Sequence, residues 1–429
     1  KKATEVVATL ASNKHKRLIC AHVEHTDIST AMRDIKLLYA LSERMASAFD
    51  EIFGTSLNTE IFGDVEEDVT QMTDNIQRLF DNLPPIPLEE NADITVADIV
   101  GKSTSKTKRK HSSQEISISE HLMKLWCVGD AGVDSSTRVA VVEFCSGKGR
   151  LSKMILDVAR FKREQKAGQA TALENKIEFS PIVLIDRTES RHDVLKSPTI
   201  ACSKGLECIR LNIDISDVTL SSVELMAESK RCCAVGKHLC GVATDLSLKC
   251  YCAGLHHRLD NHPHHLGPIG SVTLAMCCHH LCSFDDYVNV GLLQRHGIER
   301  GEFLLIKKLV TKYRCHPKET KTIAAKIAGA RAQIGVMGKR LLNEGRKVWL
   351  KGHSLALDGC GLRCIWEKVR LVRYIGEEVS PENTLLVGLA VVHPRTTAPN
   401  HGYKNQQEPT NKSTLSPSGG VVNQFITTG

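Results

Sequence analysis

Long apolar runs and aromatic side chains are what this sequence has least of. No apolar run in its 429 residues reaches the roughly 18 residues that a membrane span needs, so we expect no membrane partner. The start of the sequence shows no secretory pattern of charge followed by an apolar stretch. Aromatic residues make up only 4% of the chain, which argues against a protein that stacks many single-stranded bases on aromatic rings.

Cysteines and a modest positive charge are present instead. The chain has 16 cysteines and a formal net charge of +7. Several cysteines lie inside apolar runs, as Cys145, Cys233 and Cys277 do, and their spacing is not that of a disulfide framework. We therefore expect reduced thiols in a cytoplasmic or nuclear protein. The charge is compatible with an anionic partner but does not require one.

Strand-like apolar runs alternate with helix-like segments from Val139 onward. The expected strands are Val139–Cys145, Pro181–Arg187, Cys208–Asp217, Cys232–His238, Gly270–Cys278, Val369–Ile375 and Leu385–Val392. Continuous apolar strands separated by helices indicate an α/β fold with a mostly parallel sheet covered on both faces. The last two runs predict a closing antiparallel pair.

Three regions are expected along the chain. Residues 1–104 form an N-terminal region with one amphipathic helix over residues 69–80. The polar, basic stretch Gly101–His111 is typical of a linker or an exposed arm. Residues 105–395 contain the α/β domain. Residues 396–429 are rich in Asn, Gln, Ser, Thr and Gly, and we expect them to be disordered.

The segment VVEFCSGKGRLSKMI, Val141 to Ile155, places two glycines between a strand and a helix. Glycines let the backbone approach a ligand, and a helix N-terminus offers free N–H groups. Neither the dinucleotide fingerprint Gly-x-Gly-x-x-Gly nor a P-loop is present. A short loop behind an acid suits S-adenosylmethionine, which lacks phosphate but carries an ammonium that Glu143 can help to hold. Gly147 and Gly149 are then cofactor-binding residues; an ordinary strand–helix turn is the alternative.

Two further acids extend the predicted cofactor site. Asp186 ends the second strand, where an acid can accept hydrogen bonds from both ribose hydroxyls. An exposed strand-end aspartate without a ligand is the alternative. Asp214 ends the third run and is predicted to face the adenine edge, with a helix N-cap as an equal alternative.

The motif GKHLCGVATDL, Gly236 to Leu246, ends the fourth strand. Ligands of open parallel sheets bind beyond the carboxyl ends of the strands. Lys237, His238 and Asp245 are therefore expected near the methyl group of the cofactor and its acceptor. Thr244 is the alternative N-cap for the next helix.

The motif AMCCHHLC, Ala275 to Cys282, ends the fifth strand and is rich in metal-binding side chains. Adjacent residues of a strand point to opposite faces, and zinc sites use well-separated Cys-x₂₋₄-Cys pairs. We therefore expect no metal there. Cys277 and Cys278 are predicted to be buried, with His279 or His280 facing the acceptor.

Positive charge concentrates in KTKRKH, Lys106 to His111, and in a basic helical stretch over residues 312–352. A solvated surface is one interpretation of such a run. Contact with phosphates is the other, because it requires no reading of base sequence.

Four motifs, EFCSGKGRLS, LIDR, GKHLCGVATDL and AMCCHHLC, resemble in this order the signature blocks of the tRNA:m(4)X modification enzyme family. KRKHSSQEISISEHL is similar to the segment before that family's catalytic domain. RAQIGVMGKRLLNEGRKVWL and VRYIGEEVSPENTLLV resemble its C-terminal blocks, so the resemblance covers about residues 105–393. Cys145 stands where the family usually has the first glycine of the loop. The family's two N-terminal zinc fingers have no complete counterpart, although Cys20 with His22 or His25 resembles a remnant of one.

The resemblance implies a Rossmann-like methyltransferase that uses S-adenosylmethionine. Its expected product is a 2′-O-methylated ribose at the fourth nucleotide of some tRNAs, in the acceptor stem. Duplex RNA is recognised by shape, phosphates and 2′-hydroxyls, which agrees with the low aromatic content. The reaction needs an aligned oxygen, carbon and sulfur and the removal of one proton. His238, His279 and His280 are the candidate bases, and Lys237 is a candidate to polarise the oxygen.

Two other functions remain open from the sequence. One is a protein methyltransferase of the related methyltransferase-like twenty-five family, which has similar SGKGxLS and KHLCG motifs. The other is a catalytically inactive protein that binds S-adenosylmethionine or RNA. The C-terminal LLNEGR and SPEN motifs favour the tRNA family.

Overall fold

The computed structural model describes residues 28–62, 68–90, 94–101, 105–127, 137–165, 177–189, 195, 206–227, 229–261, 266–311, 323–357 and 362–394. The predicted C-terminal tail and the group of Cys20, His22 and His25 lie outside the described residues. Within the described ranges, no helix combines the length and the apolar character that crossing a membrane requires.

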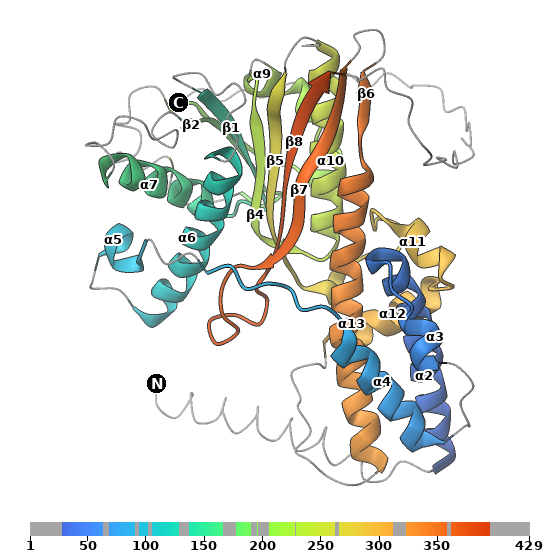
Figure 1. Cartoon of the computed structure of the whole chain (residues 1–429). Helices are drawn as coiled ribbons and strands as arrows, with labels where there is room; N and C mark the ends of the chain where they lie inside the picture. The colour runs from blue at the N-terminus through green and yellow to red at the C-terminus, as the bar shows by residue number, and fades with distance from the viewer. Residues whose placement is uncertain are drawn as a thin grey trace. The chain divides into compact units, whose positions relative to one another are not determined.

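An eight-stranded sheet forms the centre of the fold (Figure 1). Its strands are β1 Thr137–Phe144, β2 Ile177–Ile185, β3 Cys208–Leu211, β4 Cys232–Cys240, β5 Gly267–Cys277, β6 Leu355–Leu357, β7 Leu362–Arg373 and β8 Thr384–Pro394. They lie in the order β3-β2-β1-β4-β5-β8-β7-β6. Strands β1 to β5 are parallel, whereas β8, β7 and β6 pair antiparallel with their neighbours. The predicted mostly parallel sheet with a closing antiparallel pair is confirmed.

The strand order reverses at β1, which has β2 on one side and β4 on the other. At such a reversal the connections leave in opposite directions, so a crevice opens at the carboxyl ends of the two strands. In this sheet the loop that follows β1 and the last residues of β4 lie at the carboxyl ends of these two neighbouring strands. The sequence motifs with the glycines and with Lys237 are therefore brought to one place.

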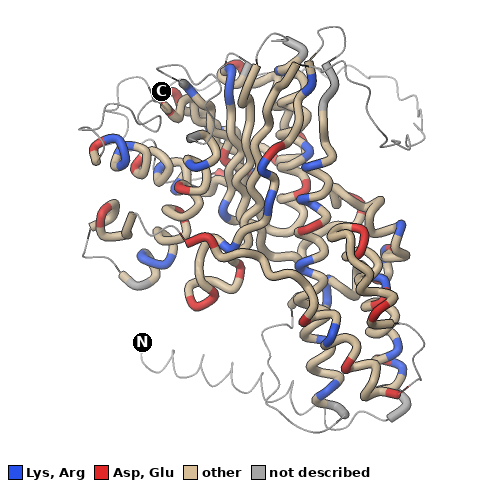
Figure 2. The backbone as a smooth tube through the Cα atoms, viewed as in Figure 1, with Lys and Arg blue, Asp and Glu red and all other residues tan. Residues whose placement is uncertain are grey.

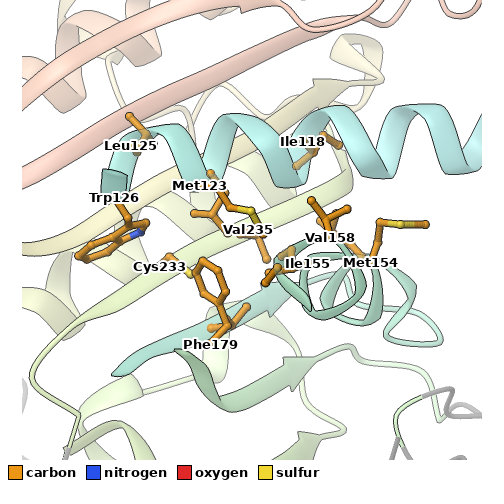
Figure 3. Packing of buried hydrophobic residues seen from close by; sticks show 14 of the residues in the cluster. Ile118, Met123, Leu125, Trp126, Met154, Ile155, Val158, Phe179, Cys233 and Val235 are labelled. Atoms are coloured by element: carbon orange, nitrogen blue, oxygen red, sulfur yellow. The ribbon is translucent and has the colours of Figure 1, made fainter. Parts of the chain in front are cut away.

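Helices cover both faces of the sheet because its strands are apolar on both sides. On one face lie α5 (Val96–Val100), α6 (Lys106–Cys127) and α7 (Arg150–Gln165). Figure 3 shows side chains of α6 and α7 packed against those of the strands. The other face packs against α10 (Val242–Asn261). Successive residues of β1 enter opposite cores, as expected for a strand.

A helical bundle forms a third core. It contains α2 Ile28–Phe53, α3 Leu57–Phe62, α4 Val69–Asn82, α11 Val290–Arg295, α12 Arg300–Leu309 and α13 Ile323–Gly352; one further short helix, α9 Glu224–Ala227, follows β3. Helix α4 begins at the position predicted for the amphipathic helix. The described helices that precede residue 104, α2, α3 and α4, share this core with α12 and α13.

Two local expectations differ from the structure. The stretch Gly101–His111 is not wholly a linker, because α6 begins at Lys106; lysine and arginine favour helices, and the next turns pack on the sheet. The third strand ends at Leu211, earlier than expected. After it, Asp214 caps the single turn Ile215–Asp217, which ends extended structure there.

A buried ion pair joins α10, which covers one face of the sheet, to α13 of the bundle. Arg346 of α13 donates Nη2–H and Nε–H to Asp245 of α10, at 2.6 and 3.0 Å, and neither residue has any exposed surface. Arg346 Nη2 also approaches the carbonyl of Gly241 at 3.5 Å and Cys282 Sγ at 3.2 Å. Although burial opposes its charge, the carboxylate of Asp245 raises the pKa of Arg346 above its usual value.

The replacement Arg346→Met should lower the free energy of unfolding by about 3–5 kcal/mol, because it leaves the Asp245 carboxylate buried without a partner. Equilibrium urea unfolding measures this loss. The matched control is Arg331→Met on the same helix, whose partner is Asp34 and which is about a third exposed; it should cost at most about 1 kcal/mol. Equal losses for the two variants would contradict the assignment.

Candidate active site

The loop that follows β1 has an unusual backbone. Cys145, Gly147 and Gly149 all have positive φ, at 51°, 51° and 72°. A side chain at such a φ is strained, whereas glycine is not. The loop is closed by hydrogen bonds from Ser146 N to Ile185 O at 3.0 Å and from Gly149 N to Ser146 O at 2.8 Å. The first left-handed position explains why a glycine is expected where this chain has Cys145.

Glu143 and Asp186 hold this loop by accepting hydrogen bonds from it. Glu143 Oε2 accepts from the N–H and the hydroxyl of Ser152, at 2.9 and 2.6 Å. Burial raises the pKa of Glu143 to about 7, and the two hydrogen bonds from Ser152 oppose that rise. Asp186 Oδ2 accepts from Gly147 N at 2.8 Å, and Oδ1 accepts from Thr188 N at 2.9 Å. Both acids thus act on the loop itself.

The loop has room in front of it for a ligand. A Cβ atom on Gly147 would meet nothing within 4 Å, so the backbone there faces open space. Gly147 is exposed, and Asp186 is half-buried beside it. The free loop surface, the α7 N-terminus and the strand-end carboxylate fit a cofactor with a ribose and no phosphate. Asp214, half-buried, accepts from Ser216 N at 3.1 Å, so the N-cap alternative is the role seen in the structure.

A lysine with a mostly buried side chain lies near the end of β4. Lys237 Nζ contacts Glu115 Oε1 at 2.8 Å, the carbonyl of His111 at 3.1 Å and His111 Nδ1 at 3.3 Å. Glu115 Oε2 also lies 3.5 Å from Arg150 at the start of α7. Burial lowers the pKa of Lys237, while Glu115 opposes that effect. Glu115 therefore links α6 to the strand and to the helix after the glycine loop.

Two histidines accompany this lysine. His238 follows it on β4 and is exposed, and its ring centroid lies 6.4 Å from that of His111. Loss of water around its ring and the charges of Lys237 and His111 lower the pKa of His238. Burial and the Lys237 charge do the same for His111. The lowered pKa values favour the neutral form of both imidazoles, which is the form that can accept a proton.

Sequence reasoning did not identify His111 and Glu115 as part of the site. His111 is the last residue of the stretch interpreted as a linker or exposed arm, and Glu115 lies four residues beyond it; the charged run hid the start of a helix. The available signal was their spacing: residues four apart in a helix lie on one face. That face of α6 meets Lys237.

Two predicted site residues point elsewhere. Asp245 is bound to Arg346, as described above, and is fully buried. His279 is 2% exposed, and its Nε2 lies 2.6 Å from Asn343 Oδ1 of α13. Burial holds the pKa of His279 well below its ordinary value. His280 is exposed. Of the four predicted catalytic residues, the structure thus groups Lys237 and His238 with the new pair from α6.

The cysteines near the ends of β4 and β5 do not follow strand alternation. Cys278 has φ of 51° and lies just after β5. Its sulfur and those of Cys240 and Cys277 all lie within 4.8 Å of one another. The reason given for expecting no metal at AMCCHHLC therefore does not hold at this point of the chain. Hydrogen bonding from Cys277, opposed by burial, lowers the pKa of Cys240.

The basic stretch over residues 312–352 is largely neutralised where the structure describes it. Figure 2 shows acidic residues among the basic ones over these helices. The ion pairs are Lys326–Asp74, Arg331–Asp34, Lys339–Glu382, Arg340–Glu344, Lys347–Glu344 and Arg346–Asp245. These basic residues of α13 are paired with acids of this chain, so the number of lysines and arginines in the helix does not indicate a phosphate-binding surface. At the start of α6, Arg109 and Lys110 are exposed.

Replacing Cys145 tests the strained loop. Cys145→Gly removes a left-handed side chain, worth about 1–2 kcal/mol, against a chain-entropy cost of about 0.5–1 kcal/mol. We expect the variant to be as stable as the parent chain or up to about 1 kcal/mol more stable. Cys145→Val, similar in size but β-branched, should lose about 1–3 kcal/mol. Urea unfolding of both proteins decides; a glycine variant less stable than the valine variant would contradict the strain.

Comparison with known proteins points to the same family as the four sequence motifs. A model of the family described as methyltransferase TRM13 matches residues 113–389. The tRNA:m(4)X modification enzyme TRM13 of Kluyveromyces lactis is 27% identical over 346 residues, which cover 76% of this chain and 74% of that protein. The Saccharomyces cerevisiae protein of that name is 26% identical over 319 residues, 65% of this chain and 62% of that protein.

The Homo sapiens homolog is 26% identical over 242 residues, 49% of this chain and 45% of that protein. The chain therefore matches less than two thirds of the S. cerevisiae and human relatives. Among solved structures, the plantazolicin methyltransferase BpumL in complex with SAH is similar to this chain. The match spans 84% of this chain and 99% of the BpumL chain, at 9% sequence identity. Its TM-score of 0.23 is too low to support a statement about this protein. The family match extends over more than half of the sequence, and on that basis the chain belongs to the methyltransferase TRM13 family.

Proposed function

We propose that this chain transfers a methyl group from S-adenosylmethionine to a ribose 2′-hydroxyl of tRNA, at the fourth nucleotide of the acceptor stem. The observation that carries the proposal is the exposed histidine His238 near the carboxyl end of β4, the strand next to β1 with its open glycine loop. A methyl donor on the loop and a proton acceptor on the neighbouring strand would meet at the carboxyl ends of β1 and β4.

The residues that would hold the cofactor are those of the loop and the two strand ends beside it. Gly147 and Gly149 would allow close approach, and Asp186 would accept from the ribose. Asp214, which caps the turn shortly after β3, would face the adenine edge. When bound, the cofactor supplies an electrophilic methyl group on a sulfonium. Glu143 keeps the loop in place from beneath through Ser152.

Within this site Lys237 would hold Glu115 and His111 in position rather than polarise the acceptor oxygen. Its ammonium has three hydrogens, and its three nearby acceptors are Glu115 Oε1, the His111 carbonyl and His111 Nδ1. Its charge lowers the pKa of His238. His238 is exposed and its pKa is lowered, which supports it as the group that would remove the proton of an incoming hydroxyl. His279, held by Asn343, is not.

The choice of tRNA as substrate is supported by the names of the relatives, which are tRNA:m(4)X modification enzymes. Exposed Arg109 and Lys110 at the start of α6 precede His111 by one turn or less. A phosphate bound there would lie next to the site, which suits a duplex recognised through its backbone.

Transfer of labelled methyl from S-adenosylmethionine to total tRNA, followed by mapping, tests the function. We expect label at nucleotide four and resistance to alkaline cleavage after that nucleotide, because a methylated 2′-oxygen cannot attack the adjacent phosphate. Label on a base, at another position or only in protein would reject the proposal. Binding of the cofactor without any transfer would leave the protein a binding protein and reject it equally.

His238→Ala should reduce kcat for tRNA by about 10²–10⁴-fold, the usual range for a general base, with little change in cofactor affinity. The acid limb of the parent's pH–rate profile should lie below the usual histidine pKa of about 6.5, since the pKa of His238 is lowered, and it should vanish in the variant. The control is His280→Ala, an exposed histidine of the fifth-strand motif, with near-parent kcat. A full rate for His238→Ala would assign the base elsewhere.

A further inference from the structure

Three sulfur atoms meet where β4 and β5 end. Cys240 and Cys277 are direct partners in the parallel ladder, and their Sγ atoms are 3.7 Å apart. With Cys278 Sγ, the three atoms lie within 4.8 Å of one another. In the described parts of the chain this is the group of at least three Cys, His, Asp or Glu side chains that is placed to hold a metal ion.

The backbone is strained in order to bring the third sulfur there. Cys278 has a left-handed φ of 51°, which costs a non-glycine residue about 1–2 kcal/mol. In a regular strand its side chain would point away from that of Cys277. The left-handed turn returns it to the side of Cys240 and Cys277. Strain of this kind collects at functional sites, and here it completes a set of ligands.

The separations are those of a thiolate site. A zinc–sulfur bond is about 2.3 Å long, so sulfurs on a tetrahedron around zinc stand about 3.8 Å apart. The 3.7 Å between Cys240 and Cys277 agrees with this value. Cys240 and Cys278 are half-buried and Cys277 is buried, so an ion has a route to the sulfurs. Soft thiolates select Zn²⁺ and Cu⁺ among common cations.

We propose that Cys240, Cys277 and Cys278 bind one soft d¹⁰ cation, Zn²⁺ or Cu⁺, through three thiolates. Each thiol that becomes a ligand releases its proton to solvent, and no electron is transferred. Zinc would keep one open position, as in sites with three protein ligands, whereas Cu⁺ is satisfied by three sulfurs. The ion would fasten the turn after β4 to the turn after β5, next to the proposed methyl-transfer site. Metal uptake does not depend on that function.

The test uses the full chain, reduced, stripped with a chelator and kept without oxygen. Co²⁺ is titrated in as a probe, and thiolate-to-cobalt charge-transfer absorption is recorded together with the protons released. Zn²⁺ and Cu⁺ are then added in separate arms. The main variant is Cys278→Gly, which removes one sulfur and also relieves the left-handed strain, so the fold is retained; Cys240→Ser is a second variant. Cys250→Ser, a half-buried thiol of α10 outside the group, is the matched control.

We expect the parent chain and Cys250→Ser to bind one equivalent of Co²⁺ at this site. In Cys278→Gly and Cys240→Ser, the affinity of the site for Co²⁺ should be at least tenfold weaker. Displacement of cobalt by Zn²⁺ assigns zinc. Uptake of Cu⁺ without displacement by Zn²⁺ assigns copper. Uptake of neither ion, or absorption that is unchanged in Cys278→Gly and Cys240→Ser while both remain folded by circular dichroism, would overturn the proposal.

Discussion

The buried pair of Asp245 and Arg346 is the constraint on which the rest of the site depends. A charged guanidinium without exposed surface is tolerable only if its partners are fixed, and these partners come from separate segments: Asp245 from α10, the Gly241 carbonyl from the turn before it, and Cys282 from the turn after β5. Arg346 therefore sets the distance between two strand ends and α13. The LLNEGR motif of the C-terminal half thus stabilises the two motifs that end β4 and β5.

The same contacts leave little freedom in the turns themselves. Gly241 has φ of 58°, and a Cβ atom there would lie 2.4 Å from the backbone carbon of Leu281. The turn after β4 is thus pressed against the turn after β5. His279, bonded to Asn343, adds a second connection to α13. Lys237 and His238 stand just before this packed region, so their backbone is fixed before any substrate arrives, as catalysis by positioning requires.

Much of the fold could be predicted from the sequence because its signals are local. Strands β1, β2 and β4 each contain a continuous apolar run, and the glycine turn after Glu143 marks where the first strand ends. What escaped prediction depends on contacts between distant segments. Asp245 at the start of a helix after a strand looks the same whether it faces a ligand or an arginine a hundred residues later. The alternation of side chains along a strand, which argued against a metal, does not hold at Cys278 because this residue has a positive φ.

The contacts of Asp186 bear on the proposal that this residue also binds the ribose of the cofactor. A carboxylate offers about four acceptor positions. Three are used here, one by Gly147 N and two by the N–H and hydroxyl of Thr188. In the proposed complex, a ribose hydroxyl would take the fourth without breaking the loop contact. A second ribose hydroxyl would have to replace the hydroxyl of Thr188, which can turn to water at little cost because it is exposed. The hydrogen bond to Gly147 would stay in place, so the loop keeps its left-handed shape while the ligand binds.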